Sequence, residues 1–170
     1  MAKIIHALFG TIDTSDREHP CATSADYQGR TIDIDLHLED DELRPADLEA
    51  EALRPLLGLV DDLAPLDAAA RLAIAADATR GDEAAAALYA SHHLEQLSDP
   101  QLAMLLPRAP KPLTAGALLE RLQLVRVGVY PASQDSPVLL DYSIDPDVTD
   151  YLLCVSFDPH GKVIAVEMES

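Results

Sequence analysis

Hydrophobic and polar positions alternate most regularly in the carboxy-terminal segment, Val138 to Ser170. Residues 138–144, 151–157 and 163–168 each alternate with a period of two, which predicts three strands. Asp158, Pro159 and Gly161 take the first, second and fourth positions of a tight turn, so the last two strands form a β-hairpin. The stretch Asp145 to Asp150 is too rich in Asp and Pro to continue a strand, and it predicts an exposed acidic loop.

The amino-terminal pattern also favours strands. Lys3 to Asp13 is mostly apolar and predicts one strand, while Thr31 to Leu38 alternates Ile or Leu with Asp or His and predicts a half-buried strand. The segment between them is rich in turn residues and predicts a loop with a short strand around Tyr27. Gln28-Gly29 can begin a hairpin that leads into Thr31.

Apolar residues recur at helical spacing through the middle of the chain, so this part is expected to be helical. Pro55 predicts a kink or break in the first helix. Residues that favour a helix start precede each predicted helix: Pro45, Pro65, Asp82, the capping-box pair Ser98 and Gln101, and Thr114. The predicted helices end near Leu63, Gly81, Leu97, Leu106 and Leu122.

Strands therefore flank a helical centre, and strand alternation resumes at Val125 to Val129. Segregated runs of this kind predict an α+β fold, in which a largely antiparallel sheet of two amino-terminal and about four carboxy-terminal strands carries four or five helices on one face. A length of 170 residues suits a single domain, 1–170. The breaker-rich stretch 107–113 can serve as a hinge within it.

Charge narrows the classes of function. The chain has 30 Asp and Glu against 12 Lys and Arg, a net charge of -18, which argues against nucleic acid as a partner because phosphate binding depends on Lys and Arg. The acids concentrate in two stretches, Asp26 to Asp62 and Asp135 to Ser170. An acidic surface attracts a basic partner and speeds the encounter. The alternative is that the acids only keep the protein in solution.

The amino-terminal sequence and the hydropathy of the chain indicate its expected cellular location. The start, MAKIIHALFG, is a short apolar run interrupted by His6, which is not typical of a signal peptide. No apolar run approaches the roughly 20 residues that a membrane span needs. We therefore expect a cytoplasmic protein with no membrane association and with free thiols at Cys21 and Cys154.

Residues that could carry chemistry do not form a recognised catalytic or metal-binding pattern. His92, His93 and Glu95 lack the spacing of a zinc protease, and the Asp145 to Asp150 segment lacks the Gly and Glu of an EF-hand. Cys21 has no third orienting group beside a nearby His, and Cys154 lies within a strand, where a buried thiol is ordinary. We predict no catalytic residue, no metal and no cofactor.

Several segments carry a resemblance to a known family. They are DYSIDPDVTDYLLCVSFDPHGKVIAVEMES at Asp141 to Ser170, LERLQLVRVGVYP at Leu119 to Pro131, and the shorter YASHHLEQL, FGTID and YQGRTIDIDLHLED. Together they resemble the bacterial domain-of-unknown-function family two thousand and four. The resemblance implies a small cytoplasmic bacterial protein without established catalytic residues, similar in some members to immunity proteins that accompany toxins.

These observations favour a non-enzymatic protein-binding protein, which we expect to be a cytoplasmic immunity protein that blocks a basic bacterial toxin domain. Binding would use aromatic anchors inside a charged rim. The candidate residues are Tyr142 and Tyr151 as anchors, Asp145, Asp147 and Asp150 as charge partners, and Glu39, Asp40, Asp41 and Glu42 as a second patch. Each Tyr is equally well explained as a sheet-core residue. A housekeeping scaffold or homodimer, and a small metal-binding or small-molecule-dependent enzyme, remain as alternatives.

Overall fold

The computed structural model describes residues 3–18, 21–39 and 41–170 of the chain. Helices and strands are both present, and the helices occupy the middle of the sequence. In chain order the elements are β1 (Lys3–His6), β2 (Gly10–Asp13), β3 (Cys21–Tyr27), β4 (Arg30–Leu36), η1 (Pro45–Leu48), α1 (Ala50–Asp61), α2 (Leu63–Asp77), α3 (Ala85–Gln96), α4 (Asp99–Leu105), α5 (Ala115–Leu119), β5 (Gln123–Val129), β6 (Val138–Ser143), β7 (Leu152–Phe157) and β8 (Val163–Glu169).

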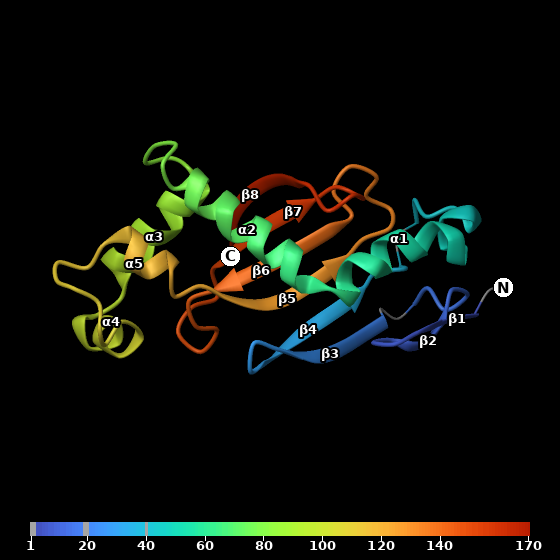
Figure 1. Cartoon of the computed structure of the whole chain (residues 1–170), viewed down its shortest axis with the longest axis horizontal. Coiled ribbons are helices and arrows are strands. Elements are labelled where there is room, and N and C mark those ends of the chain that lie inside the picture. The colour runs from blue at the N-terminus through green and yellow to red at the C-terminus, as the bar shows by residue number, and fades with distance from the viewer. Residues whose placement is uncertain (1–2, 19–20, 40) are drawn as a thin grey trace.

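The main sheet has six strands in the order β3-β4-β5-β6-β7-β8 (Figure 1). All neighbours are antiparallel except β4 and β5, which run parallel. A parallel pair needs a long crossover, and here the whole helical centre provides it. The α+β class with a mostly antiparallel sheet is thus confirmed, and β1 and β2 form a separate two-stranded sheet.

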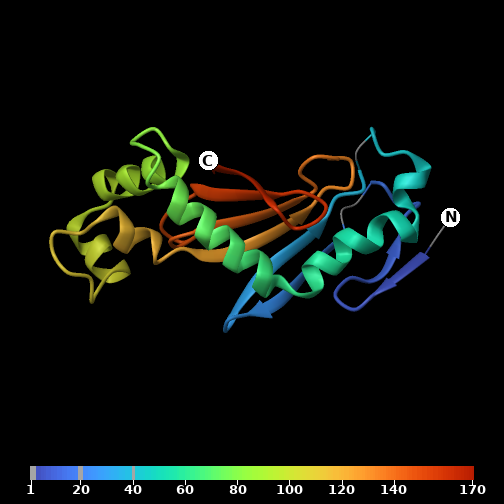
Figure 2. The ribbon, with the colours of Figure 1, turned by 45° about the horizontal axis from the view of Figure 1, so that its top comes forward.

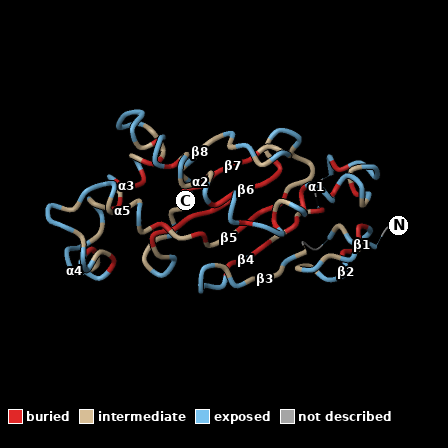
Figure 3. Tube along the Cα trace, in the orientation of Figure 1, coloured by how far each residue is buried: buried red, intermediate tan, exposed pale blue. Residues whose placement is uncertain are grey.

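The helices α1 and α2 cross one face of this sheet, as the two views in Figures 1 and 2 show. Alternate strand residues point toward them and are fully buried, among them Ile34 of β4, Val127 of β5 and Leu140 of β6. Figure 3 shows the buried trace concentrated in the central strands. The apolar alternation of the sequence therefore defines the core between the helices and the sheet.

Local turn chemistry accounts for several boundaries. Gln28 and Gly29 both have positive φ, 50° and 78°, which is the conformation of a two-residue hairpin turn and confirms the predicted hairpin into β4. Gly161 has a φ of 79°, and its N–H donates to the carbonyl of Asp158 at 3.0 Å, as the β7–β8 turn requires. Thr114 caps α5 by accepting from the N–H of Ala117 at 3.2 Å.

Other boundaries correct the sequence predictions. The predicted single strand from Lys3 to Asp13 is two short strands, because the chain turns back before Gly10, whose φ is 67°. The helix expected to start at Asp82 begins at Ala85. Its first turn is capped from another helix, since the carboxylate of Asp77 in α2 accepts from the N–H of Ala86 at 2.9 Å.

One of two proline-containing segments also differs from expectation. Pro55 lies inside α1, and the break comes earlier, at Glu49 between η1 and α1. Residues 106–114, which include the predicted hinge, connect α4 to α5 without regular secondary structure.

Candidate functional site

The sheet face turned away from α1 and α2 is the most distinctive surface of the molecule, and we call it the open face. Strand register places six carboxylates and one arginine on it among the described residues: Asp26, Asp33, Asp35, Asp141, Glu167, Glu169 and Arg126. Asp26, Asp33, Glu167 and Glu169 are exposed. The open face is therefore strongly negative at its edges.

Arg126 of β5 organises the centre of the open face. Its Nε donates to Asp35 on one side at 2.6 Å, and Nη1 donates to Asp141 on the other side at 2.9 Å. Burial opposes the charge on Arg126, but hydrogen bonds to Tyr130, Asp35 and Asp141 outweigh it and raise the pKa of the guanidinium. Arg126 therefore stays charged, and its single positive charge beside the two carboxylates of Asp35 and Asp141 makes the centre less negative than the edges.

Tyr130 covers part of this centre with a half-exposed aromatic ring. Its hydroxyl accepts from Nη2 of Arg126 at 2.8 Å, and its ring stacks on His37 with centroids 4.4 Å apart. Gly128 makes room for the ring, because a Cβ at this position would lie 2.6 Å from Cε2 of Tyr130. The aromatic group is thus fixed in place before any partner arrives.

His37 connects the open face to the second predicted patch. Arginine has only N–H donors, so Nη2 of Arg126 donates to Nε2 of His37 at 3.0 Å, and Nδ1–H of His37 donates to Glu39 at 3.2 Å. Glu39, Asp41 and Glu42 are exposed at this end of β4. Asp40 lies outside the described residues.

The loop between β6 and β7, residues 144–151, carries the first predicted patch. Asp147 and Asp150 are exposed, while Asp145 is half-buried and accepts from the N–H of Asp147 at 3.0 Å. The carbonyl of Asp145 also accepts from the N–H groups of Val148 and Thr149 at 3.0 and 3.2 Å. The acidic loop is therefore a tight, internally bonded turn.

Helix α3 holds this loop through His93, which is 2 % exposed. Nδ1–H of His93 donates to the carbonyl of Tyr89 at 2.7 Å, so the neutral ring accepts the hydroxyl proton of Thr149 at Nε2, at 2.9 Å. Burial lowers the pKa of His93 and favours this neutral form. The ring of Tyr151 packs on His92 with centroids 4.4 Å apart. Tyr151 is half-buried against α3 and keeps part of its ring at the surface.

Tyr142 is not at the surface. Its ring is fully buried between the sheet and α2, and its hydroxyl donates to Oδ1 of Asp67 at 2.7 Å. An interface anchor must be accessible, so Tyr142 does not belong to a binding surface in this fold. Its position could have been inferred from the sequence, because Tyr142 shares its strand parity with Leu140 and Ile144, which are also fully buried.

The two predicted patches lie at opposite ends of the sheet. Ser143, before the acidic loop, pairs with Gln123 at the start of β5, whereas Leu36, before Glu39, pairs with Val129 at its end. Seven residues of strand separate them, roughly 20 Å. The open face extends between the two ends and was not singled out from the sequence. The Asp33, Asp35 and His37 alternation in β4 was its signal.

Groups capable of metal binding or nucleophilic chemistry are not assembled in the described part of the chain. No cluster of three or more His, Cys, Asp or Glu there could hold a metal ion. Cys154 is buried on the open-face side of β7, where burial and the carboxylates of Asp141 and Glu169 raise the pKa of its thiol. Cys154 is therefore protonated at neutral pH. Among the described helices, none is long and apolar enough to cross a membrane.

The fold and the open face together define an α+β protein that covers one side of a six-stranded sheet with helices and presents an acidic surface on the other. Comparison with family models, with curated proteins and with solved structures gave no match. The resemblance to the domain-of-unknown-function family stays a prediction from the sequence.

Proposed function

We propose that the protein binds a basic protein partner through the open face, without catalysing a reaction, and that it is an immunity protein of the bacterial cytoplasm that neutralises a toxin domain. The observation that supports this most is the arrangement of charge. Outer carboxylates surround a centre in which Arg126 offsets one of the two charges of Asp35 and Asp141. A charged edge around a less charged, ordered centre matches the anatomy of tight inhibitor interfaces.

The outer acids would act mainly on the rate of encounter. Asp33 on β4 and Glu167 on β8 lie near opposite edges of the sheet, so a basic partner would be attracted across the whole face. Electrostatic steering raises association rates and weakens with salt. The half-exposed Tyr130 replaces Tyr142 as the candidate anchor, because aromatic side chains held in place lose little entropy on binding.

The test is co-expression with a candidate toxin encoded by a neighbouring gene, followed by growth rescue and measurement of association kinetics. The Asp33→Lys and Glu167→Lys double variant should slow association and flatten its salt dependence. The matched control is Glu51→Lys with Glu95→Lys, which makes the same charge change at exposed positions of α1 and α3. The control should behave as wild type.

Three outcomes decide between the surfaces. Loss of rescue only with Asp33→Lys and Glu167→Lys supports the open face. Loss only with Asp145→Lys, Asp147→Lys and Asp150→Lys would transfer the binding site to the β6–β7 loop. Equal effects of the open-face and control variants would refute a specific acidic site. A symmetric dimer in sedimentation that binds no neighbouring gene product would instead support the structural homodimer.

A further inference from the structure

Three arginines converge on one hollow at the end of the sheet where the β3–β4 turn meets α2 and the start of β5. The hollow has a volume of about 320 Å³, and we call it the arginine pocket; Arg30, Arg71 and Arg121 line it together with Tyr27, Gln28 and Gln123. These arginines are three of only 12 Lys and Arg residues in a chain with a net charge of -18. The pocket is a positive region in an otherwise acidic protein.

Arg71 is fixed in place by a buried carboxylate. Its Nε donates to Asp67 at 3.0 Å, and its Nη1 donates to the carbonyl of Leu122 at 3.2 Å. Asp67 is 3 % exposed and also accepts from Tyr142, Tyr27 and Gln28. With so many donors Asp67 is satisfied, so its role toward the pocket is to orient Arg71.

The other two arginines, Arg30 and Arg121, form no ion pair with an acid among the described residues. In the part of the chain that the structure describes, no carboxylate lies within salt-bridge distance of Arg30 or Arg121. Glu120 is the one carboxylate among the lining residues, and it is exposed. Asp67 offsets the charge of Arg71, and the two guanidinium groups of Arg30 and Arg121 against the one exposed carboxylate of Glu120 leave a net positive charge that favours an anionic ligand.

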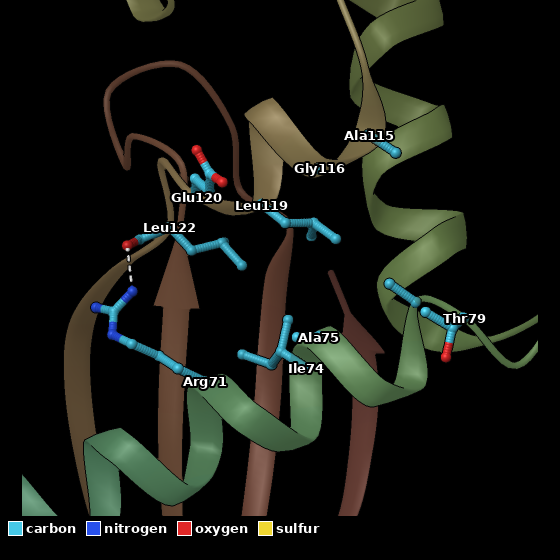
Figure 4. A pocket seen from close by; sticks show the side chains of 10 residues that line it. Arg71, Ile74, Ala75, Thr79, Ala115, Gly116, Leu119, Glu120 and Leu122 are labelled. Atoms are coloured by element: carbon cyan, nitrogen blue, oxygen red, sulfur yellow. Dashed lines mark hydrogen bonds between the residues drawn. The ribbon is translucent and has the colours of Figure 1, made fainter.

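An apolar groove adjoins the arginine pocket. It runs between α2 and α5 with a volume of about 560 Å³, and Figure 4 shows Leu119 and Ile74 facing each other across it. Its lining is completed by small side chains such as Ala75, Ala78 and Ala115. Arg71, Glu120 and Leu122 line both hollows, so the Arg71–Leu122 hydrogen bond lies where they meet.

We propose that these two hollows form one binding site for a small amphiphilic carboxylate, with the anionic head in the arginine pocket and a medium-length apolar chain in the groove. The groove follows α2 from Arg71 to the end of the helix at Asp77, roughly 9 Å, and continues along the turn to Thr79, a length that suits a chain of about eight carbons. Its volume is in the ordinary range for ligand sites, and its lining is mostly apolar with few polar groups. The site lies on the helical side of the sheet, so it is independent of binding at the open face.

Octanoate is the probe, and calorimetric titration is the assay. Wild-type protein should bind octanoate saturably, and octanol and acetate should bind much more weakly because each lacks one half of the ligand. Arg121→Gln should weaken binding roughly tenfold or more, since a hydrogen bond to a charged group is lost. Arg54→Gln on α1 is the matched control, because it removes an exposed arginine far from the pocket in sequence and outside its lining.

The groove is tested by a second pair of variants on the same helix. Ala75 and Ala76 are both exposed on α2, but only Ala75 lines the groove. Ala75→Glu should abolish octanoate binding by placing a carboxylate beside the apolar chain, and Ala76→Glu should leave it unchanged. Glu is a good helix former, so both variants should fold.

Absence of saturable octanoate binding at millimolar concentration would overturn the proposal. Equal losses from Ala75→Glu and Ala76→Glu would likewise remove the groove from the site. Inorganic phosphate binding as tightly as octanoate, with Ala75→Glu unaffected, would reduce the site to a simple anion pocket and refute the amphiphile.

Discussion

Removal of one hydroxyl group at Tyr142 should destabilise the protein clearly, because that group donates to a buried charge. The Tyr142 hydroxyl lies 2.7 Å from Oδ1 of Asp67, and both side chains are almost completely buried. Tyr142→Phe keeps the ring and creates no large cavity, so the change isolates the hydrogen bond. A hydrogen bond to a charged group contributes about 1.5–3 kcal/mol.

Tyr27→Phe is the internal control, since Tyr27 donates to the other oxygen of the same carboxylate. That bond is longer, 3.2 Å, and Tyr27 lies half-buried on the edge strand β3, where water can replace the lost donor. We expect Tyr142→Phe to lower the free energy of unfolding by about 2 kcal/mol and Tyr27→Phe by less than about 1 kcal/mol.

Urea denaturation measures both losses. With a slope of about 2 kcal/mol per molar urea, Tyr142→Phe should lower the midpoint by about 1 M, and the melting temperature should fall by about 4–8 °C. Equal losses in the two variants, or no loss in Tyr142→Phe, would refute the assignment of the Tyr142–Asp67 hydrogen bond as a bond to a buried charge.

The hydrogen bond between Tyr142 and Asp67 also predicts how the stability of the protein depends on pH. Burial, followed by the hydrogen bond to Asp67 and its charge, raises the pKa of Tyr142 above the ordinary value of about 10. The unfolded chain therefore loses this proton more readily than the folded protein. The contribution of Tyr142 to the free energy of unfolding is complete below about pH 10 and declines as the pH rises further. Wild type should lose stability faster than Tyr142→Phe above that pH.

Three further predictions concern the loop, the open face and the thiols. The free energy of unfolding should fall as the pH drops below about 6.5, because burial lowers the pKa of His93 and the unfolded chain takes up a proton first. In His93→Gln the dependence of the free energy of unfolding on pH should be weaker, and urea denaturation at several pH values measures it. Gly128→Ala should displace the Tyr130 ring and cost about 1–3 kcal/mol, with a changed tyrosine fluorescence or ring NMR signal as the direct sign. A thiol reagent should modify half-buried Cys21 in the folded protein and should reach Cys154 only after denaturant is added. Equal rates of modification of the two thiols in the folded protein would contradict the burial of Cys154.

The local elements were largely predictable because their causes are local. The β7–β8 hairpin depends on Asp158 and Gly161, and the cap of α5 depends on Thr114, so a short window of sequence contains the whole reason for each. The cap of α3 was missed for the opposite reason. Asp77 supplies it from the preceding helix, and only the folded chain brings that carboxylate to Ala86.

The candidate sites were less predictable because both depend on distant segments. Arg126 is an ordinary strand residue until β4 and β6 place Asp35 and Asp141 on either side of it. In the same way, Arg30 and Arg121 line one hollow only in the folded chain. Alternation indicated which face of β4 is polar, but it could not show that this face has an arginine at its centre.

The parallel pairing of β4 with β5 has a consequence for the order of folding. Strands β5 to β8 follow one another directly and can form a meander from local contacts. Asp35 and Arg126, in contrast, are 91 residues apart in sequence, so their junction requires closure of a long loop. We expect the meander to form early and the β3–β4 hairpin to dock late. Until the hairpin docks, the unpaired edge of β5 is exposed and would be the main route to misassembly. Packing of the helical centre closes the long loop and brings β4 to that edge.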